Sequence, residues 1–438
     1  MSAFDFQKYH RALEKTDTIE RAGRVTKIVG LAVEASGPAS RIGDICNLFT
    51  LDGTRSVRAE IVGFRDSSTL LMPFGSLEGV GLGSYVLYTG TSLKVPVGRE
   101  LVGRVLDALG NPFDDLPPPE PDTWYPADNA PPNPLTRDRI REILPLGVKA
   151  IDGMLTVGRG QRLGIFSGSG VGKSTLLGMI ARYAVADINV IVLVGERGRE
   201  VKDFLEKDLG EEGLKKSILV IATSDQPALL RLKCAMTGTA IAEYFRDCGY
   251  KVLLLMDSLT RFAMAQREIG MAAGEPPVSR GFPPSVYTIL PKLLERSGMS
   301  DKGSITGLYT VLVEGDDMNE PISDTVRGIL DGHIVLSRAI ANSNHYPPID
   351  ILGSVSRVMP DIVTQEHFKA FGTIKNMLAV YREAEDLINI GAYKHGANPE
   401  IDRAVKLRPA IQSFLRQGMD ESFTFEETAD IMAEIVSG

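Results

Sequence analysis

The segment Ser167-Gly168-Ser169-Gly170-Val171-Gly172-Lys173-Ser174 combines glycines, a lysine and a hydroxyl, the groups needed to hold phosphates. It follows the apolar run Arg162–Phe166 and opens a helical pattern over Ser174–Val185. Glycines allow backbone conformations in which consecutive N–H groups converge on phosphate oxygens, and the helix adds its positive N-terminal end. We therefore expect this loop, together with Thr175, to bind a nucleoside triphosphate.

Within this loop, Lys173 is expected to place its ammonium group at the β- and γ-phosphates, and the Ser174 hydroxyl to coordinate Mg²⁺. The strict pattern GxxxxGK[ST] has glycine first, where this chain has Ser167, but a small residue is tolerated there. A dinucleotide-binding loop fits less well, because the glycine spacing differs and that motif has no lysine in this role. The expected ligands are ATP and Mg²⁺.

Two carboxylates could complete such a site. Asp257 ends the apolar run Val252–Met256, and a buried strand would hold it rigidly where it can bind water ligands of Mg²⁺. Glu196 lies in the segment Val194–Glu200, after the strand that follows the phosphate-loop helix. We expect that strand to neighbour the phosphate loop, with Glu196 as general base and Arg197 neutralising γ-phosphate charge. Taken alone, this segment would be a solvated mixed-charge turn.

Length and composition limit the classes of protein. A chain of 438 residues exceeds one core and suggests two or three domains. The net charge of −8 argues against a general nucleic-acid binder, which needs a basic face. Three scattered cysteines and five histidines without ligand spacing suggest neither a zinc site nor a disulfide framework. No signal peptide is apparent, and the apolar runs are too short to span a membrane, so we expect a cytoplasmic protein.

The pattern along the chain predicts three kinds of structure. Phe4 to about Arg21 resembles an amphipathic helix, either a capping helix or a docking segment. Between Gly23 and about Pro96, short apolar runs alternate with glycine-containing turns, which indicates a small β-barrel. The predicted strands are Arg24–Ile28, Ile45–Thr50, Arg55–Phe64, Thr69–Met72 and Tyr85–Thr89.

Eight prolines between Leu116 and Leu135 exclude a helix or a central strand and predict an extended surface connection. From about Leu146, buried runs alternate with helical patterns, which indicates a parallel sheet covered on both faces. After about Asp361 the pattern is mostly helical. The predicted core strands and later helices are Arg162–Phe166, Asn189–Val194, Lys251–Met256, Ile305–Val313, His333–Leu336, Phe368–Asn389 and Pro399–Phe414.

Four segments together resemble the rotary and protein-secretion ATPase family, which shares the catalytic core of ATP synthase. They are SGSGVGKS (167–174), VGERGREV (194–201), LLLMDSLTRFA (253–263) and HYPPIDILGSVSRVMP (345–360). Gly274–Gly298 and Val313–Ile340 are similar to the flagellum-specific branch that serves bacterial type III export. An injectisome ATPase of the virulence type is the close alternative.

The resemblance implies roles for named residues. Glu196 falls at the catalytic carboxylate of the family and Arg197 at its γ-phosphate arginine, while Lys173, Ser174 and Asp257 match the phosphate-loop and metal-side residues. Two further matches concern the adenine and the neighbouring subunit. Arg357 matches an arginine finger that reaches the ATP of the next subunit, and Tyr346 an aromatic that stacks on adenine. Without the resemblance, a surface ion pair and a packed loop aromatic would be favoured for these two.

The implied fold is of the α/β class: a docking helix (1–22), a six-stranded β-barrel (23–95), a RecA-like core with the proline-rich connection (96–360) and a helical region (361–438). The implied assembly is a homohexamer around a coiled-coil central stalk protein, faced by the loop Asp316–Glu320 and by Gly274–Pro284. Further implied partners are a negative regulator at the N-terminal helix, export gate membrane proteins and chaperone–substrate complexes. The implied location is the cytoplasmic face of the inner membrane.

Three rival classes stay open. A non-catalytic ring subunit would carry an amide where this chain has Glu196. A hexameric nucleic-acid translocase would need a basic and aromatic barrel face, whereas Gly23–Pro96 lacks tryptophan and has mixed charge. The catalytic subunit of ATP synthase itself is disfavoured by Gly274–Gly298 and by the N-terminal docking helix. We therefore expect an ATP hydrolase of type III export that binds no nucleic acid.

Overall fold

The structure of the chain is a computed structural model that describes Phe6, His10 and residues 20–313, 315 and 317–437. The chain divides into two units. One comprises Met1–Leu93 with Glu268–Pro276, and the other comprises Lys94–Arg267 with Pro277–Gly438. The predicted N-terminal helix lies outside the described residues, apart from Phe6 and His10, and Arg21 already belongs to a strand.

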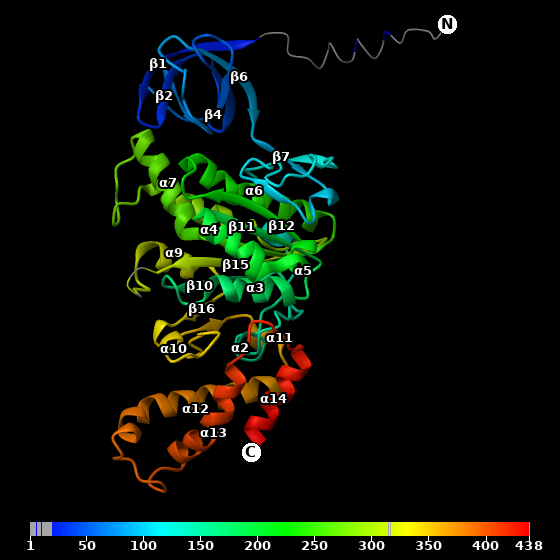
Figure 1. The fold of residues 1–438 in the computed structure, drawn as a ribbon, viewed down its shortest axis with the longest axis vertical. Coiled ribbons are helices and arrows are strands. Elements are labelled where there is room, and N and C mark those ends of the chain that lie inside the picture. Colours follow the sequence, from blue (N-terminus) through cyan, green and yellow to red (C-terminus); the bar gives the residue numbers. More distant parts are fainter. Residues whose placement is uncertain (1–5, 7–9, 11–19, 314, 316, 438) are drawn as a thin grey trace. The chain divides into compact units, whose positions relative to one another are not determined.

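The first unit contains a closed antiparallel barrel with the order β1-β2-β5-β4-β3-β6 (Figure 1). Alternate residues point inward because successive side chains of a strand face opposite sides, and Val33, Ile61 and Val86 are fully buried there. The six-stranded barrel is confirmed, although the sequence missed β2, a short strand after the turn at Gly30. The strands are β1 (Arg21–Val29), β2 (Ala32–Ser36), β3 (Asp44–Phe49), β4 (Ser56–Arg65), β5 (Ser68–Pro73) and β6 (Tyr85–Ser92).

The second unit is built on a mostly parallel sheet with the order β17-β16-β10-β15-β13-β11-β12-β8, with β14 paired to β15. The parallel sheet and all five core strands predicted from the sequence are confirmed; β8 and β12 were missed. The strands are β8 (Val105–Asp107), β10 (Arg162–Ser167), β11 (Ile188–Glu196), β12 (Ser217–Thr223), β13 (Lys251–Asp257), β14 (Gly298–Met299), β15 (Ser304–Leu312), β16 (Gly332–Leu336) and β17 (Val355–Ser356).

One expectation about this sheet is wrong. The strand that carries Glu196, β11, does not neighbour the phosphate-loop strand β10, because β15 and β13 lie between them. Parallel strands need not follow chain order, since each crossover helix can return the chain several positions away. Glu196 and the phosphate loop nevertheless share the carboxyl edge of the sheet, so side chains can meet there across the intervening strand ends.

Helices cover both faces of the sheet (Figure 1). On β11, Leu193 belongs to the same apolar cluster as Leu176 of α3 (Lys173–Tyr183). The adjacent residue Val192 instead faces α6 (Ala228–Asp247), where a Cβ at Gly238 would lie 2.3 Å from its side chain. This alternation along one strand is what a sheet buried on both faces requires.

The remaining helices of the central region are short or border loops. They are α2 (Lys149–Met154), α4 (Gly198–Asp203), α5 (Gly210–Lys215), α7 (Leu259–Ala273), α8 (Pro284–Leu294), α9 (Pro321–Ile329), α10 (Arg338–Asn342) and α11 (Met359–Ile362), with a π-helical segment at Phe204–Leu209. The proline-rich connection is extended, as expected. Part of it, β9 (Thr123–Pro126), pairs only with β7 (Lys94–Val97), in a separate two-stranded sheet.

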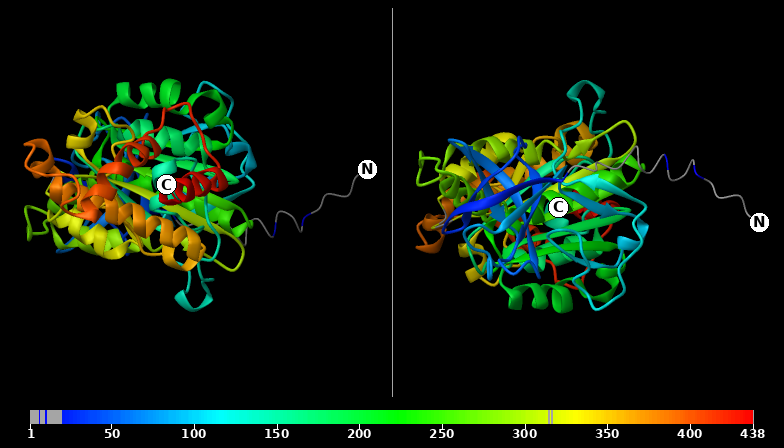
Figure 2. Two further views of the ribbon diagram at one scale, coloured as in Figure 1. Left: turned by 90° about the horizontal axis from the view of Figure 1, so that it is seen from below. Right: turned by 90° about the horizontal axis from the view of Figure 1, so that it is seen from above.

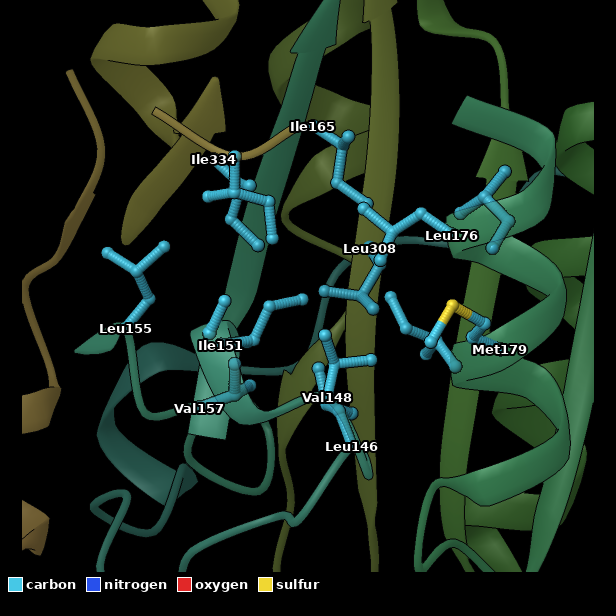
Figure 3. Packing of buried hydrophobic residues seen from close by; sticks show 14 of the residues in the cluster. Leu146, Val148, Ile151, Leu155, Val157, Ile165, Leu176, Met179, Leu308 and Ile334 are labelled. Carbon is cyan, nitrogen blue, oxygen red and sulfur yellow. The ribbon is translucent and has the colours of Figure 1, made fainter. Parts of the chain in front are cut away.

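The C-terminal helical region is confirmed and consists of α12 (Gln365–Asn389), α13 (Pro399–Leu415) and α14 (Phe425–Ser437). Figure 1 shows these helices, in orange and red, grouped at one end of the second unit, and in the left view of Figure 2, seen from below, they lie in front. They belong to the same apolar cluster as the stretch from Leu144 to Val157 ahead of the phosphate-loop strand. Figure 3 shows this stretch packed beside β10, β15 and α3.

Across the described part of the chain, we find no helix with both the length and the apolar character needed to cross a bilayer.

Candidate nucleotide-binding site

The phosphate loop leaves β10 at Ser167 and enters α3 at Lys173. Gly170 and Gly172 have φ angles of +76° and +92°, a left-handed conformation that side chains with a Cβ rarely adopt. Gly172 caps α3 without any side-chain hydrogen bond, so the first N–H groups of this helix stay available to an anion. The loop therefore has the conformation that its glycines were expected to provide.

Lys173 lies between two carboxylates. Its Nζ is 2.5 Å from Asp257 Oδ1 and 3.7 Å from Glu196 Oε1. The three side chains are largely buried, which strengthens the interactions among these charges relative to water. The structure thus brings together the predicted phosphate lysine, the metal-side carboxylate and the candidate base, although they come from α3, β13 and β11.

A backbone irregularity directs Glu196 to this cluster. The pairing of β11 with β12 shifts register between Val194 and Glu196, and Gly195 between them has a φ of +69°. Such a bulge re-aims the side chain that follows it. A glycine suits this position because of its positive φ, and a Cβ there would lie only 3.3 Å from Arg261.

The environment of Glu196 favours its protonated form. Burial and, next to it, the negative charge of Asp257 raise the pKa of Glu196 to about 7, against the opposing positive charge of Lys173. A carboxyl group with a pKa near neutral pH can both accept and release a proton under ordinary conditions. The geometry and the electrostatics together make Glu196 suited to proton transfer.

Asp257 is held by a residue that the sequence did not single out. Thr310, fully buried on β15, donates its hydroxyl hydrogen to Asp257 Oδ1 at 2.7 Å. Because β15 lies next to β13, this hydroxyl is fixed by the sheet itself. No motif marks Thr310, since it sits inside an ordinary apolar strand and acts through strand pairing.

The adenine and finger candidates lie elsewhere. Tyr346 is half exposed, and its ring lies beside the phosphate loop, 3.6 Å from the position that a Cβ at Gly172 would occupy. Arg357 follows the edge strand β17 and is exposed, with its N–H donating to the Asp331 carbonyl at 3.0 Å. The structure therefore brings Tyr346 to the phosphate loop but does not bring Arg357 there.

Two predicted residues are engaged outside the cluster. Arg197 is exposed and lies 3.6 Å from the carboxylate of Glu200, one turn along α4. The side chain of Thr175 hydrogen-bonds to Asp208. Burial raises the pKa of the Asp208 carboxyl group, and this hydrogen bond offsets only part of the rise. The remaining loop residues keep their expected places, with Gly168 and Val171 buried and Ser169, Gly170 and Ser174 exposed.

Three further arginines make contacts that the sequence did not predict, two of them at the site and one, Arg280, away from it. Arg338 donates to the carbonyl oxygen of Ser169 in the phosphate loop at 3.1 Å. Arg261 packs against Gly195, and its buried Nε has no hydrogen-bond partner among the described residues. Arg280 pairs with Asp317 at 3.2 Å, which joins the two loops expected to face a central channel. Only the tertiary fold reveals these neighbours.

The polar atoms of the site fit a magnesium-bound triphosphate. Ser167 Oγ and Glu196 Oε1 are buried and lack hydrogen-bond partners within the described ranges. Buried polar atoms are normally satisfied, so these exceptions, one in the phosphate loop and one beside Lys173, fit a polar ligand at this place. The Ser174 hydroxyl and the Asp257 carboxylate are oxygen donors of the kind that Mg²⁺ prefers.

Comparisons with known proteins agree with this site. Residues 147–356 match the nucleotide-binding domain of the ATP synthase alpha/beta family. Residues 25–90 match the beta-barrel domain of that family, and residues 363–434 match the C-terminal domain of the type III secretion ATPase EscN.

Whole-chain relatives extend this agreement. The chain is 56% identical to the flagellum-specific ATP synthase of Bacillus subtilis, with 95% of each chain covered. It is 51% identical to the type 3 secretion system ATPase of Xanthomonas euvesicatoria, covering 95% of this chain and 94% of that one.

Solved structures give the same result. The assembled ATPase EscN of enteropathogenic E. coli matches with a TM-score of 0.90 at 48% identity. The structure of EscN with its central stalk EscO matches with a TM-score of 0.88 at 47% identity. Each match covers 94% of this chain and 100% of the other. The chain therefore belongs to the ATP synthase alpha/beta family and is an ATP-hydrolysing member of its flagellar and type III secretion branch.

Proposed function

We propose that this chain hydrolyses ATP in a homohexameric ring, that each active site is completed by a neighbouring subunit, and that hydrolysis drives flagellar protein export. One observation carries the proposal. Lys173, Asp257 and Glu196 meet at the carboxyl edge of the sheet, whereas Arg357 lies at the opposite end of the same sheet.

Within one subunit, the phosphate loop and Lys173 hold the triphosphate. Glu196 accepts a proton from the attacking water while the water oxygen forms a bond to the γ-phosphorus. The bond between that phosphorus and the bridging oxygen breaks, and ADP leaves with this oxygen. Bound Mg²⁺, held by Ser174 and through water by Asp257, would neutralise phosphate charge. Arg197 is exposed at the start of α4, and it would exchange its pair with Glu200, at 3.6 Å, for the γ-phosphate.

The sheet geometry supports a role for Arg357 in the next subunit. Asp331, which accepts the Arg357 N–H, precedes β16 and also pairs with Arg162 at the beginning of β10. The phosphate loop begins after Ser167, five residues later, which is about 16 Å along an extended strand. Because this separation runs along a rigid strand, Arg357 is poorly placed to serve its own phosphate loop.

Adenine binding is assigned to Tyr346. Its half-exposed ring beside Gly172 offers an apolar face next to the phosphates. Aromatic faces stack on nucleobases with useful affinity.

We further propose that a coiled-coil stalk protein occupies the centre of the ring. EscN, which resembles this chain along most of its length, has been solved with its central stalk EscO. The Arg280–Asp317 pair supports this, because it links one residue from each of the two loops expected to face the stalk.

The other proposed partners are chaperone–substrate complexes, export gate membrane proteins and a negative regulator at residues 1–22, with the ring peripheral to the inner membrane. We propose the domain boundaries 1–22, 23–95, 96–360 and 361–438. The flagellar assignment is supported by the higher identity to the Bacillus subtilis flagellar relative than to the Xanthomonas euvesicatoria secretion ATPase. An injectisome role is the alternative.

The proposal is tested by measuring the specific rate of phosphate release against protein concentration. We expect a steep rise as subunits assemble, since the finger comes from a neighbour. Lys173→Ala should lower the rate about 10²–10³-fold at every concentration, because a preorganised cation at the transferred phosphate is lost. Lys202→Ala on the exposed face of α4 is the control and should behave as wild type. A constant specific rate at high dilution, or an active Lys173→Ala, would contradict the proposal.

A further inference from the structure

Gln417 occupies a junction between three segments that are far apart in the sequence. It lies just after α13, in the C-terminal helical region, and is only 6% exposed. A buried amide needs partners for its oxygen and for both amide hydrogens, and those partners fix its position. In this structure Gln417 satisfies all of them with backbone groups.

The first partner is the stretch ahead of the phosphate-loop strand. Gln417 Oε1 accepts from the Lys149 N–H at 2.9 Å, and Gln417 Nε2 donates to the Gly147 carbonyl at 2.8 Å. The same amide group donates to the Glu421 carbonyl at 2.8 Å, which shapes the loop after α13. The side chain thus fastens that loop to the start of α2.

The second partner is the residue assigned to adenine. The backbone N–H of Gln417 donates to the carbonyl oxygen of Tyr346 at 3.0 Å. Tyr346 in turn places its ring beside Gly172 of the phosphate loop. A chain of short contacts therefore runs from Lys149 through Gln417 to Tyr346.

The stretch to which the Gln417 side chain is hydrogen-bonded, residues 147–149, is itself firmly packed. Asp152 accepts from the N–H groups of Leu146 and Gly147, both at 2.8 Å. Figure 3 shows Leu146 and Val148 packed in the apolar cluster beside α3 and β15. Gln417 therefore connects Tyr346 to a fixed part of the core rather than to a loose loop.

We infer that Gln417 is a positioning residue that holds Tyr346 against the base of the nucleotide, so that the C-terminal helical region sets the affinity for the base and not for the phosphates. This inference rests on the proposed role of Tyr346. The phosphates are held by Ser167–Ser174, whereas the hydrogen bonds described for the Gln417 side chain go to Lys149, Gly147 and Glu421. Loss of the side chain should free the loop after α13 and, with it, the Tyr346 carbonyl.

The test compares a ligand that has a base with one that lacks it. Calorimetric titration of the full chain with MgADP and with magnesium pyrophosphate separates the two parts of the site. In Gln417→Ala we expect the Kd for MgADP to rise about fivefold, the equivalent of one net hydrogen bond, and that for pyrophosphate to change by less than about twofold. If the alanine variant folds poorly, Gln417→Glu replaces it in the test. This variant keeps the acceptor but loses both donors, and it should show the same contrast between MgADP and pyrophosphate.

Two further variants make the outcomes distinct. His367→Gln is the matched control, because buried His367 also joins the helical region to α2, through Gly153 at 2.9 Å, without contacting Tyr346. It should leave both affinities unchanged. Tyr346→Ala should lose affinity for MgADP alone.

If Tyr346→Ala loses MgADP affinity and Gln417→Ala does not, the inference about Gln417 is wrong while the base assignment stands. If Tyr346→Ala keeps its MgADP affinity, the base assignment itself fails. If Gln417→Ala lowered the affinity for MgADP and for pyrophosphate equally, Gln417 would have only a general structural role, and the inference would be overturned.

Discussion

The proposed nucleotide site has a phosphate side and an Arg357 side, and the two differ in how completely a single chain builds them. On the phosphate side, Lys173, Asp257 and Glu196 contact one another in a largely buried cluster. Arg357 instead stands exposed beside the edge strand β17, anchored by its backbone to Asp331. The same sheet therefore carries a preorganised cluster of charged side chains at one end and, at the other, an exposed arginine for which no side-chain partner is found among the described residues.

The contrast indicates where regulation can act. A cluster that is complete within one chain lets that chain bind nucleotide alone, because binding needs only groups already in place. A cation that serves a neighbouring site makes the rate of hydrolysis depend on assembly, since transition-state charge is fully neutralised only across an interface. Assembly would then switch hydrolysis on without altering how each subunit grips phosphate.

Arg357→Ala gives the largest expected effect and tests this division most directly. The rate of phosphate release should fall about 10³-fold or more, the range of an arginine finger. The affinity for MgADP should stay close to that of wild type, because no predicted phosphate ligand is removed. Steady-state rates and calorimetric titration of the same preparation check both statements.

Mixing variants separates a finger in trans from one in cis. Arg357→Ala subunits keep Lys173, and Lys173→Ala subunits keep Arg357. In a randomly mixed ring with head-to-tail interfaces, about one interface in four would then carry both intact groups. We expect the mixture to regain measurable activity that neither variant has alone. A mixture as inactive as its parts would place both groups in the same subunit's site.

Glu196→Gln tests the phosphate side at its chemical step. The amide cannot accept a proton from water, so kcat should fall about 10²–10³-fold. Because the side chain keeps its size, MgADP affinity and the thermal unfolding temperature should change little. A rate equal to that of wild type would remove Glu196 as the base and leave the cluster as a binding device only.

The pH dependence of kcat/KM sharpens the assignment of Glu196. The active form of a general base is the carboxylate, and burial together with the charge of Asp257 raises the pKa of Glu196 to about 7. The rate should therefore fall as the pH drops through about 7, by about tenfold per pH unit below it. The residual activity of Glu196→Gln should not show this fall in rate at low pH. If the fall persists in the variant, it is caused by the titration of another group.

The residues that the structure brings together on the phosphate side could be singled out from the sequence, because they sit in local patterns. A glycine loop between a strand and a helix, and a carboxylate at the end of an apolar strand, can be recognised within a few residues. The barrel and the helical region were also predictable, since turn residues and hydrophobic periodicity are local signals.

What the sequence could not predict depends on contacts between distant segments. The position of β11, which two strands separate from β10, is set by crossover connections that leave no local pattern. Gln417 and Thr310 contact the site only because separate segments pack together, and neither stands in a motif. Local sequence thus singled out the charged groups that the structure brings together beside the phosphate loop, but not the residues that hold them.

Thr310→Val tests whether such a holding residue contributes to the phosphate side, and its expected effect is the smallest. Valine has nearly the shape of threonine but cannot donate to Asp257, so the carboxylate loses its hydrogen bond at 2.7 Å. We expect kcat to fall about fivefold, the equivalent of one net hydrogen bond. Thr239→Val is the matched control, because Thr239 is also fully buried but donates only to the Ala235 carbonyl within α6. If both variants lose the same small amount of activity, Asp257 is held by the strand alone, and the preorganisation of the phosphate side does not extend to β15.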